Sequence, residues 1–431
     1  MGSCRPGSCS PLPPPEVRGS LLATGPVILA RPITLDRDDE LEPAWERVGL
    51  PPAARQLLLE SVGRAHLLVT GLGTAESRFL REVEDPRLTC IVADPGYRPG
   101  GATVAGTRAG LEALARLAEG RGLGELARAL DVAMATGVPP DPTVLGARTF
   151  RWGERTHVMG VVNVTPDSFS DGGRHLEREA AVQHALALVE AGADLLDIGG
   201  ESTRPGAGEV PIQVELERVL PVIQALRAAT GVPLSIDTRK AEVARQALDA
   251  GAVLVNDVSG LGHEAALGTV VARAGATLAL MHIQGKPETM QVDPRYDDLV
   301  AEVVESLAGS VDRAVAAGVR RERIWVDPGI GFGKTVGHNL FLLRHLAELR
   351  VLGAPILVGT SRKRFLGVLA GGRPPEQRLP GTLASVAAVA VLHGADVVRV
   401  HDVAEVRDAL AVADAIARAR EGGDAWGPPR S

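Results

Sequence analysis

Eight short apolar segments, each running into polar residues, recur along the C-terminal part of the chain. They are VMGVVN, DLLDIGG, PLSID, VLVND, TLALMH, IWVD, PILVGT and VVRVH. Near-continuous apolar runs of this kind are typical of parallel strands that are buried on both faces. Eight such strands alternating with helices favour a closed barrel over the alternative, an open doubly wound sheet. We therefore expect one site, built from the carboxyl ends of all eight strands.

The stretches between these segments have the pattern of amphipathic helices. Many are followed by glycine, which tolerates the left-handed conformation that ends helices. The expected helices span residues 177–191, 214–229, 240–250, 264–274, 299–317, 339–349, 383–392 and 403–417. The predicted fold class is α/β, a TIM (β/α)8 barrel preceded by a small α+β domain.

Composition divides the rest of the chain. A Pro-, Ser- and Gly-rich start predicts a disordered tail. The segment after it predicts an α+β accessory domain with strands near HLLVTGL, LTCIVAD and ATVAGT and with helices near ARQLLLESVG, 75–83 and 108–119. This segment contains no cluster that resembles a catalytic site, so a role in oligomerisation or stability is expected. The predicted divisions are a tail at 1–26, an accessory domain at 27–137, a linker at 138–155, the barrel at 156–420 and a flexible tail at 421–431.

Charge and cysteine content narrow the range of possible functions and cellular compartments. The 431 residues carry a formal net charge of −7, which argues against sequence-independent binding to nucleic acid or to an anionic membrane surface. No apolar run is long enough to span a bilayer. Three cysteines, two of them in the tail, do not form a disulfide framework and fit a reducing compartment. We expect a cytoplasmic protein that acts on a small molecule.

Polar side chains occupy the predicted strand ends. A single Asp or Asn there is as often a turn or a helix cap as a ligand-binding group. Asp237 and Asp327 differ because each follows an apolar strand and neither opens an obvious helix; a buried carboxylate needs donors, such as the NH groups of a planar heterocycle. The full set is Asn163, Thr203, Asp237, Asn256, Asp327, Ser361, Lys363, Arg399 and His401.

Cations at the last two strands point to an anion. Arg399 and His401 are two residues apart on one strand, so both face the same side, which in a barrel is the lumen. A lone histidine is usually structural, but the arginine beside it favours anion binding. SRKR is either a solvated basic loop or a source of the inward-pointing Lys363. His282 ends the fifth strand, where metal binding is possible, although no zinc-like ligand spacing is present.

Three glycine-rich or polar loops complete the pattern. DPGIGFGK is not a phosphate-binding G-x-x-x-x-G-K-[ST] loop, and its glycines are interpreted as allowing close backbone approach at the mouth. NVTPDSFSDGG and ESTRPGAGEV are either plain long connections or loops that close over a substrate.

Together the motifs NVTPDSFSDGG, GGESTRPGA, SIDT, NDVSG, LMH, DPGIGFGK, GTSRKRF and RVHD resemble the dihydropteroate synthases, over about residues 156 to 420. This resemblance implies a TIM barrel that joins 6-hydroxymethyl-7,8-dihydropterin diphosphate to 4-aminobenzoate, releases diphosphate, requires Mg²⁺ and is blocked by sulfonamides. It also implies a homodimer.

The resemblance assigns roles motif by motif. It implies that the pterin is held by Asp237, Asn256, Asp327 and Lys363, and the diphosphate by Asn163, Arg399 and His401. It implies that Mg²⁺ lies near Asn163 and Asp171, and that the aminobenzoate pocket is formed by Thr203, Arg204, Pro205, Phe169 and Ser361. Met281 and Phe332 complete the expected substrate-binding set, and the expected catalytic residues are Asp237, Lys363, Arg399 and His401.

The implied chemistry is substitution at a CH₂ group with diphosphate as the leaving group. Carbon–oxygen cleavage first gives a pterin-stabilised cation, which the neutral aryl amine attacks, so no strong general base is needed. Mg²⁺, Arg399 and His401 stabilise the leaving charge in this scheme. Loop closure after diphosphate binding implies ordered addition of the two substrates.

Two other functions remain open. A methyltetrahydrofolate:corrinoid methyltransferase barrel shares the pterin residues but does not need the TPDSFSDGG loop or the SRK and RVH anion site. A non-catalytic pterin-binding paralogue is signalled by loss of Asn163, Asp237, Lys363 or Arg399, and none of them is lost. The N-terminal region departs from the minimal synthase and carries no signature of the kinase that makes the pterin diphosphate.

Overall fold

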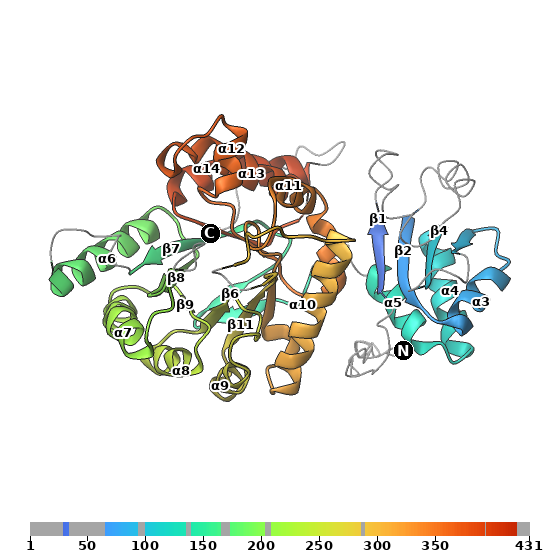
Figure 1. Ribbon diagram of the computed structural model, residues 1–431, viewed down its shortest axis with the longest axis horizontal. Coiled ribbons are helices and arrows are strands. Elements are labelled where there is room, and N and C mark those ends of the chain that lie inside the picture. Colours follow the sequence, from blue (N-terminus) through green and yellow to red (C-terminus); the bar gives the residue numbers. More distant parts are fainter. Residues whose placement is uncertain are drawn as a thin grey trace, which may run out of the picture.

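An eight-stranded parallel sheet forms the centre of the larger part of the molecule (Figure 1). The computed structural model describes residues 29–33, 65–93, 100–134, 139–164, 173–202, 208–285, 289–392 and 394–419. The sheet order is β12-β11-β10-β9-β8-β7-β14-β13, and a parallel bridge between Val326 and Ile356 joins its two edges. The strands are β7 His157–Asn163, β8 Leu195–Gly199, β9 Leu234–Asp237, β10 Leu254–Asp257, β11 Thr277–Met281, β12 Ile324–Asp327, β13 Leu357–Val358 and β14 Val397–Val400.

Helices surround this barrel. They are α6 Gly173–Glu190, α7 Ile212–Ala229, α8 Ala241–Ala250, α9 Ala266–Ala274, α10 Leu299–Ala316, α11 Val336–Arg344, α12 Arg364–Leu369, α13 Leu379–Val391 and α14 Val403–Arg418, with 3₁₀ turns η3 Arg321–Arg323, η4 Leu346–Leu352 and η5 Pro375–Gln377. The predicted TIM barrel is therefore confirmed. The helix expected at 339–349 is instead split into α11 and η4, because the three-residue spacing of Leu346, Leu349 and Leu352 suits a 3₁₀ turn that buries all three. The short helix α12 was not predicted.

A β-hairpin closes the amino-terminal end of the barrel. Strands β5 Thr143–Leu145 and β6 Arg148–Phe150 pair within the segment predicted as a linker. Phe150 and the following Trp152 pack against Trp325 of β12, with ring centroids 6.2 and 5.3 Å apart. The Trp325 indole donates to Thr143 Oγ1 at 3.3 Å, so its polar atom is satisfied inside the core. The hairpin is thus part of the barrel's core.

The N-terminal part of the chain has its own antiparallel sheet and its own apolar core (Figure 1). The strand order is β1-β2-β4-β3. Its elements are β1 Leu29–Ile33, β2 Ala65–Leu72, α3 Thr74–Glu82, β3 Leu88–Val92, β4 Gly100–Gly106, α4 Arg108–Gly120 and α5 Gly124–Met134. The predicted α+β character is confirmed, β1 and α5 were not predicted, and the helix expected near ARQLLLESVG lies outside the described residues.

The N-terminal unit rests on the side of the barrel. Strand β1 and helix α5 contact η4, and Val132 of α5 packs against the barrel's apolar core. Within the described ranges, no helix is long and apolar enough to cross a membrane.

We expect Phe150→Ala to destabilise the barrel by about 3–5 kcal/mol, because it leaves a cavity beside Trp325. The measurement is urea unfolding followed by tryptophan fluorescence. Val144→Ala on the same hairpin is the control: Val144 is 47% exposed, so its loss should change the free energy of unfolding by less than about 0.5 kcal/mol. Equal effects of the two changes would show that the hairpin does not plug the barrel.

Candidate functional site

The carboxyl ends of the strands bring most of the predicted site residues to one end of the barrel. In a parallel barrel the strand ends share one mouth. Strands β7, β9, β11 and β12 end at Asn163, Asp237, Met281 and Asp327, and Asn256 and Arg399 each lie one residue before the end of their strand. Phe332, Ser361, Lys363 and His401 follow in the loops. Five predicted residues, Phe169, Asp171, Thr203, Arg204 and Pro205, lie outside the described residues.

A carboxylate that the sequence prediction missed connects this site. Asp197 of β8 is fully buried and accepts hydrogen bonds from Arg399 Nε at 2.6 Å and Asn256 Nδ2 at 3.0 Å. Ser235 Oγ donates to its other oxygen at 2.5 Å. Arg399 Nη2 also donates to Asp237 Oδ2 at 2.8 Å. Four strands are therefore joined through side chains inside the barrel.

Asp197 was overlooked because it lies inside an apolar run instead of at its end. The alternation argument that places Arg399 and His401 on one side applies equally to β8, where Asp197 and the terminal Gly199 are two residues apart. This two-residue spacing from the strand end was the sequence signal that Asp197 points to the same side as the residue at the mouth.

The charged groups in this network shift one another's pKa values. Burial raises the pKa of Asp237 to about 7; the Arg399 guanidinium lowers it, and the nearby Asp197 carboxylate raises it further. Burial alone would lower the pKa of Arg399, but the attraction of Asp197 and Asp237 outweighs burial and raises it. Arg399 is consequently a fixed cation in the barrel.

Asp327 at the end of β12 and Lys363 form a second set of buried charges, close enough for each to shift the pKa of the other. Burial raises the pKa of Asp327, an effect that the Lys363 ammonium opposes. Burial also lowers the pKa of Lys363 to about 8, against the attraction of Asp327. The Lys363 ammonium donates to the carbonyl of Ile330 and lies 4.7 Å from the centroid of the Phe332 ring. The prediction that Lys363 of SRKR reaches inward agrees with this geometry.

The glycines of DPGIGFGK allow close packing, as expected. Gly329 has φ 69°, and a Cβ there would lie 1.8 Å from the carbonyl oxygen of His282. Gly331 has φ 84°, and a Cβ there would lie 3.1 Å from Lys363 Cδ. Both the left-handed backbone and the lack of space therefore require glycine.

Lys334, at the end of the same motif, was also missed. Its buried ammonium lies 2.8 Å from His282 Nδ1 and donates to the carbonyl of Phe332 at 3.1 Å. Burial lowers the pKa of Lys334 to about 7 and that of His282 to about 3, so the imidazole is neutral at physiological pH. The Nδ1 atom of His282 is engaged by this lysine, which holds the Phe332 loop.

The last two strands bring Ser361 and His401 together. Ser361 Oγ lies 2.9 Å from His401 Nδ1 and accepts the His401 backbone N–H at 3.2 Å. Arg362, by contrast, pairs with Asp402, its Nε lying 3.0 Å from Oδ2. The SRKR loop therefore sends Lys363 toward the lumen while Asp402 neutralises Arg362.

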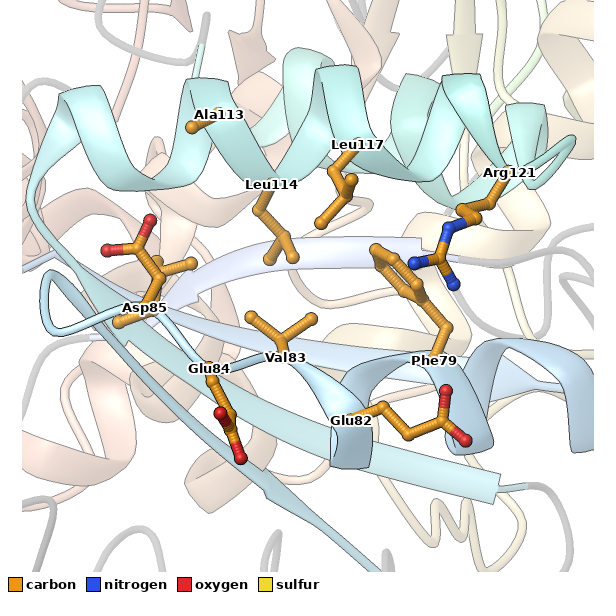
Figure 2. A pocket seen from close by; sticks show the side chains of 10 residues that line it. Phe79, Glu82, Val83, Glu84, Asp85, Ala113, Leu114, Leu117 and Arg121 are labelled. Atoms are coloured by element: carbon orange, nitrogen blue, oxygen red, sulfur yellow. The ribbon is translucent and has the colours of Figure 1, made fainter.

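A separate pocket of about 300 Å³ lies in the N-terminal unit (Figure 2). Figure 2 shows Leu114 and Leu117 of α4 above it, with acidic side chains along the other side. The lining carries three carboxylates, Glu82, Glu84 and Asp85, and one arginine, Arg121. Because the carboxylates outnumber the cation, the barrel mouth is the better candidate for an anionic substrate.

Residues 159–401 match the family model described as pterin binding enzyme. The chain belongs to this pterin-binding family. It is 50% identical to the dihydropteroate synthase of Synechocystis sp. over 262 residues, which is 61% of this chain and 90% of that protein. It is 47% identical to the dihydropteroate synthase of Escherichia coli over 245 residues, 57% of this chain and 86% of that protein.

Solved structures agree with the sequence relatives. The Yersinia pestis dihydropteroate synthase in a sulfonamide drug complex matches with a TM-score of 0.61 and 45% identity, over 65% of this chain and all of that chain. The Xanthomonas albilineans enzyme in complex with 7,8-dihydropteroate matches with a TM-score of 0.59 and 46% identity, again over 65% and 100%. The predicted membership of the dihydropteroate synthases is confirmed.

We expect Asp197→Asn to lower the pKa of Asp237, because it removes a like charge and leaves Arg399 to pair with Asp237 alone. If the ionised Asp237 is the substrate-binding form, activity is lost as the pH falls through this pKa, so the acid limb moves to lower pH. The measurement is the pH dependence of kcat/KM for the pterin substrate, which reports groups of the free enzyme. A shift to higher pH, or none, would contradict the assigned coupling.

Proposed function

We propose that this chain condenses 6-hydroxymethyl-7,8-dihydropterin diphosphate with 4-aminobenzoate, giving 7,8-dihydropteroate and diphosphate. The observation that carries the proposal is the buried network of Asp197, Asn256, Asp237 and Arg399, together with the opposite charges of Asp327 and Lys363. Family membership and the product-bound relative support the same reaction.

The pterin fits this set of groups. A pterin edge carries N–H donors and ring acceptors, and it needs both kinds of partner when it is desolvated. In the proposed arrangement Asp237 and Asp327 accept its N–H groups, while Asn256 and Lys363 supply donors. Met281 and Phe332 provide apolar contact at the mouth.

Arg399 and His401 are proposed to hold the diphosphate, together with Asn163. Arg399 is kept charged and oriented by Asp197, so its contribution needs no rearrangement as negative charge develops on the leaving group. His401 is oriented by Ser361. Ser361 is also proposed to lie near the aminobenzoate carboxylate, in the pocket that Phe169, Thr203, Arg204 and Pro205 complete.

The reaction is proposed to proceed by carbon–oxygen cleavage followed by attack of the neutral aryl amine on the pterin-stabilised cation. The ionised carboxylate of Asp237 stabilises that positive charge. The neutral aryl amine needs no strong base in order to attack, because the anilinium formed with the new C–N bond is acidic and releases its proton to water. Asp237, Lys363, Arg399 and His401 are the proposed catalytic residues.

Mg²⁺ is the proposed cofactor, held by Asn163 and Asp171. Asn163 lies at the end of β7, beside the strand of Arg399, and offers the hard oxygen donor that this ion prefers. Mg²⁺ is usually bound by one or two protein oxygens, and water and substrate phosphates complete its coordination. When bound, Mg²⁺ supplies positive charge to the diphosphate.

A cytoplasmic homodimer is the proposed setting, with sulfonamides as inhibitors that replace aminobenzoate. Val412 and Ile416 of α14 are 62% and 59% exposed, and α14 packs beside α13, which ends next to the exposed Leu392. A second copy covering this apolar strip would remove it from water.

The deciding measurement is diphosphate release by the purified protein with the pterin diphosphate and Mg²⁺, with and without 4-aminobenzoate. We expect aminobenzoate-dependent release together with dihydropteroate, and loss of both when EDTA removes the metal. Tight pterin binding without product would instead identify a non-catalytic pterin-binding protein.

We expect Lys363→Ala to lower kcat/KM by at least about a hundred-fold, since it removes a donor of the proposed pterin pocket and the positive charge that opposes the raised pKa of Asp327. Arg364→Ala is the matched control, because Arg364 is the exposed neighbour. Circular dichroism checks that both variants fold. Near-normal turnover of the Lys363 variant would remove this residue from the site.

A further inference from the structure

A buried lysine joins the two flanks of the segment that follows β8. Lys240, directly before α8, has a side chain only 4% exposed. Its ammonium donates to the Glu201 carboxylate, to the carbonyl of Val210 at 2.5 Å and to Glu215 Oε2 at 2.6 Å. Glu201 precedes residues 203–207, whereas Val210 and Glu215 follow them.

Other contacts fix the first flank. Arg239 Nη2 donates to Glu201 Oε1 at 2.9 Å, and Arg218 of α7 donates to the carbonyl of Gly200 at 2.7 Å. A Cβ at Gly200 would lie 2.7 Å from Val219 Cγ1, so the backbone there rests directly on α7. The chain entering residues 203–207 is therefore attached to α7 and to the start of α8.

The charges of this cluster balance inside the protein. Two neighbouring cations, Arg239 and Lys240, face the carboxylates of Glu201 and Glu215. Burial lowers the pKa of Lys240, but hydrogen bonds and attraction from both carboxylates outweigh burial and raise it. A buried pair of this kind holds its geometry, because loss of one partner leaves an uncompensated charge.

We propose that Lys240 is a positioning residue for the aminobenzoate subsite. It fixes both flanks of the segment that carries Thr203, Arg204 and Pro205, and it does so from the short loop that follows Asp237, the last residue of β9. Its effect on catalysis rests on the function proposed above. Lys240 acts through these flanks, so its loss affects the second substrate more than the pterin.

The kinetic test compares Lys240→Met with Lys240→Arg and with Arg245→Met. We expect Lys240→Met to raise the KM for 4-aminobenzoate about ten-fold or more, with the KM for the pterin diphosphate changed less than about three-fold. Lys240→Arg, which keeps the charge, should restore part of the loss. Arg245→Met is the control on α8, since it removes only the exposed pairs with Glu242 and Asp249.

Glu201→Gln is the second variant. It weakens the contact between Lys240 and the first flank but leaves the Lys240–Glu215 ion pair in place. This variant therefore keeps the test valid if Lys240→Met does not fold. We expect a smaller rise in the same KM. Equal changes in both KM values, or a fall in kcat alone, would overturn the proposal.

Hydrogen exchange provides a readout that does not depend on turnover. In the substrate-free protein, mass spectrometry should show backbone amides of residues 200–210 exchanging about ten-fold faster in Lys240→Met, with residues 328–335 unchanged. Unchanged exchange at 200–210 would refute the positioning role. If the wild-type protein forms no dihydropteroate, the proposed function fails, while the exchange result still decides whether Lys240 fixes the flanks.

Discussion

The ion pair between Asp197 and Arg399 is the interaction on which the candidate site depends. It joins β8 to β14 inside the barrel, and through Asn256, Ser235 and Asp237 it reaches two further strands. Buried charges of opposite sign are costly to separate, so each strand end is held in register with the others by its side chains as well as by the sheet. The same pair keeps a cation at the mouth of a protein whose net charge is negative.

Site residues at the strand ends were predictable from sequence, whereas the buried residues that hold them in place were not. Asp237 and Asp327 end apolar runs where a barrel must open, so their positions follow from the fold class. Asp197 interrupts a run before its end, which reads as an exception within a core strand. Its role could be recognised only from the structure, in which polar side chains of neighbouring strands contact it in the lumen.

Lys334 and Lys240 escaped prediction for a different reason. Lys334 is the last residue of DPGIGFGK, Lys240 follows SIDT by two residues, and both look like surface lysines near the start of a helix. Their burial depends on partners far along the chain, His282 for one and Glu201 with Glu215 for the other. The hairpin was hidden by the prolines that precede it and by its glycine, which are typical of linkers, although Phe150 and Trp152 are among the few aromatic residues of the chain.

The hairpin also sets an order of assembly. Its strands leave the ribosome before any strand of the barrel, yet the residues that it packs against include Leu357 and Val397 near the other end of the chain. The floor of the barrel cannot close until those strands have been synthesised. Until then Trp325 has no complete surroundings, and in the order of synthesis the last pairing that becomes available is that of β14 with β7. A barrel built in this way is sealed from below only when its final strand is in place.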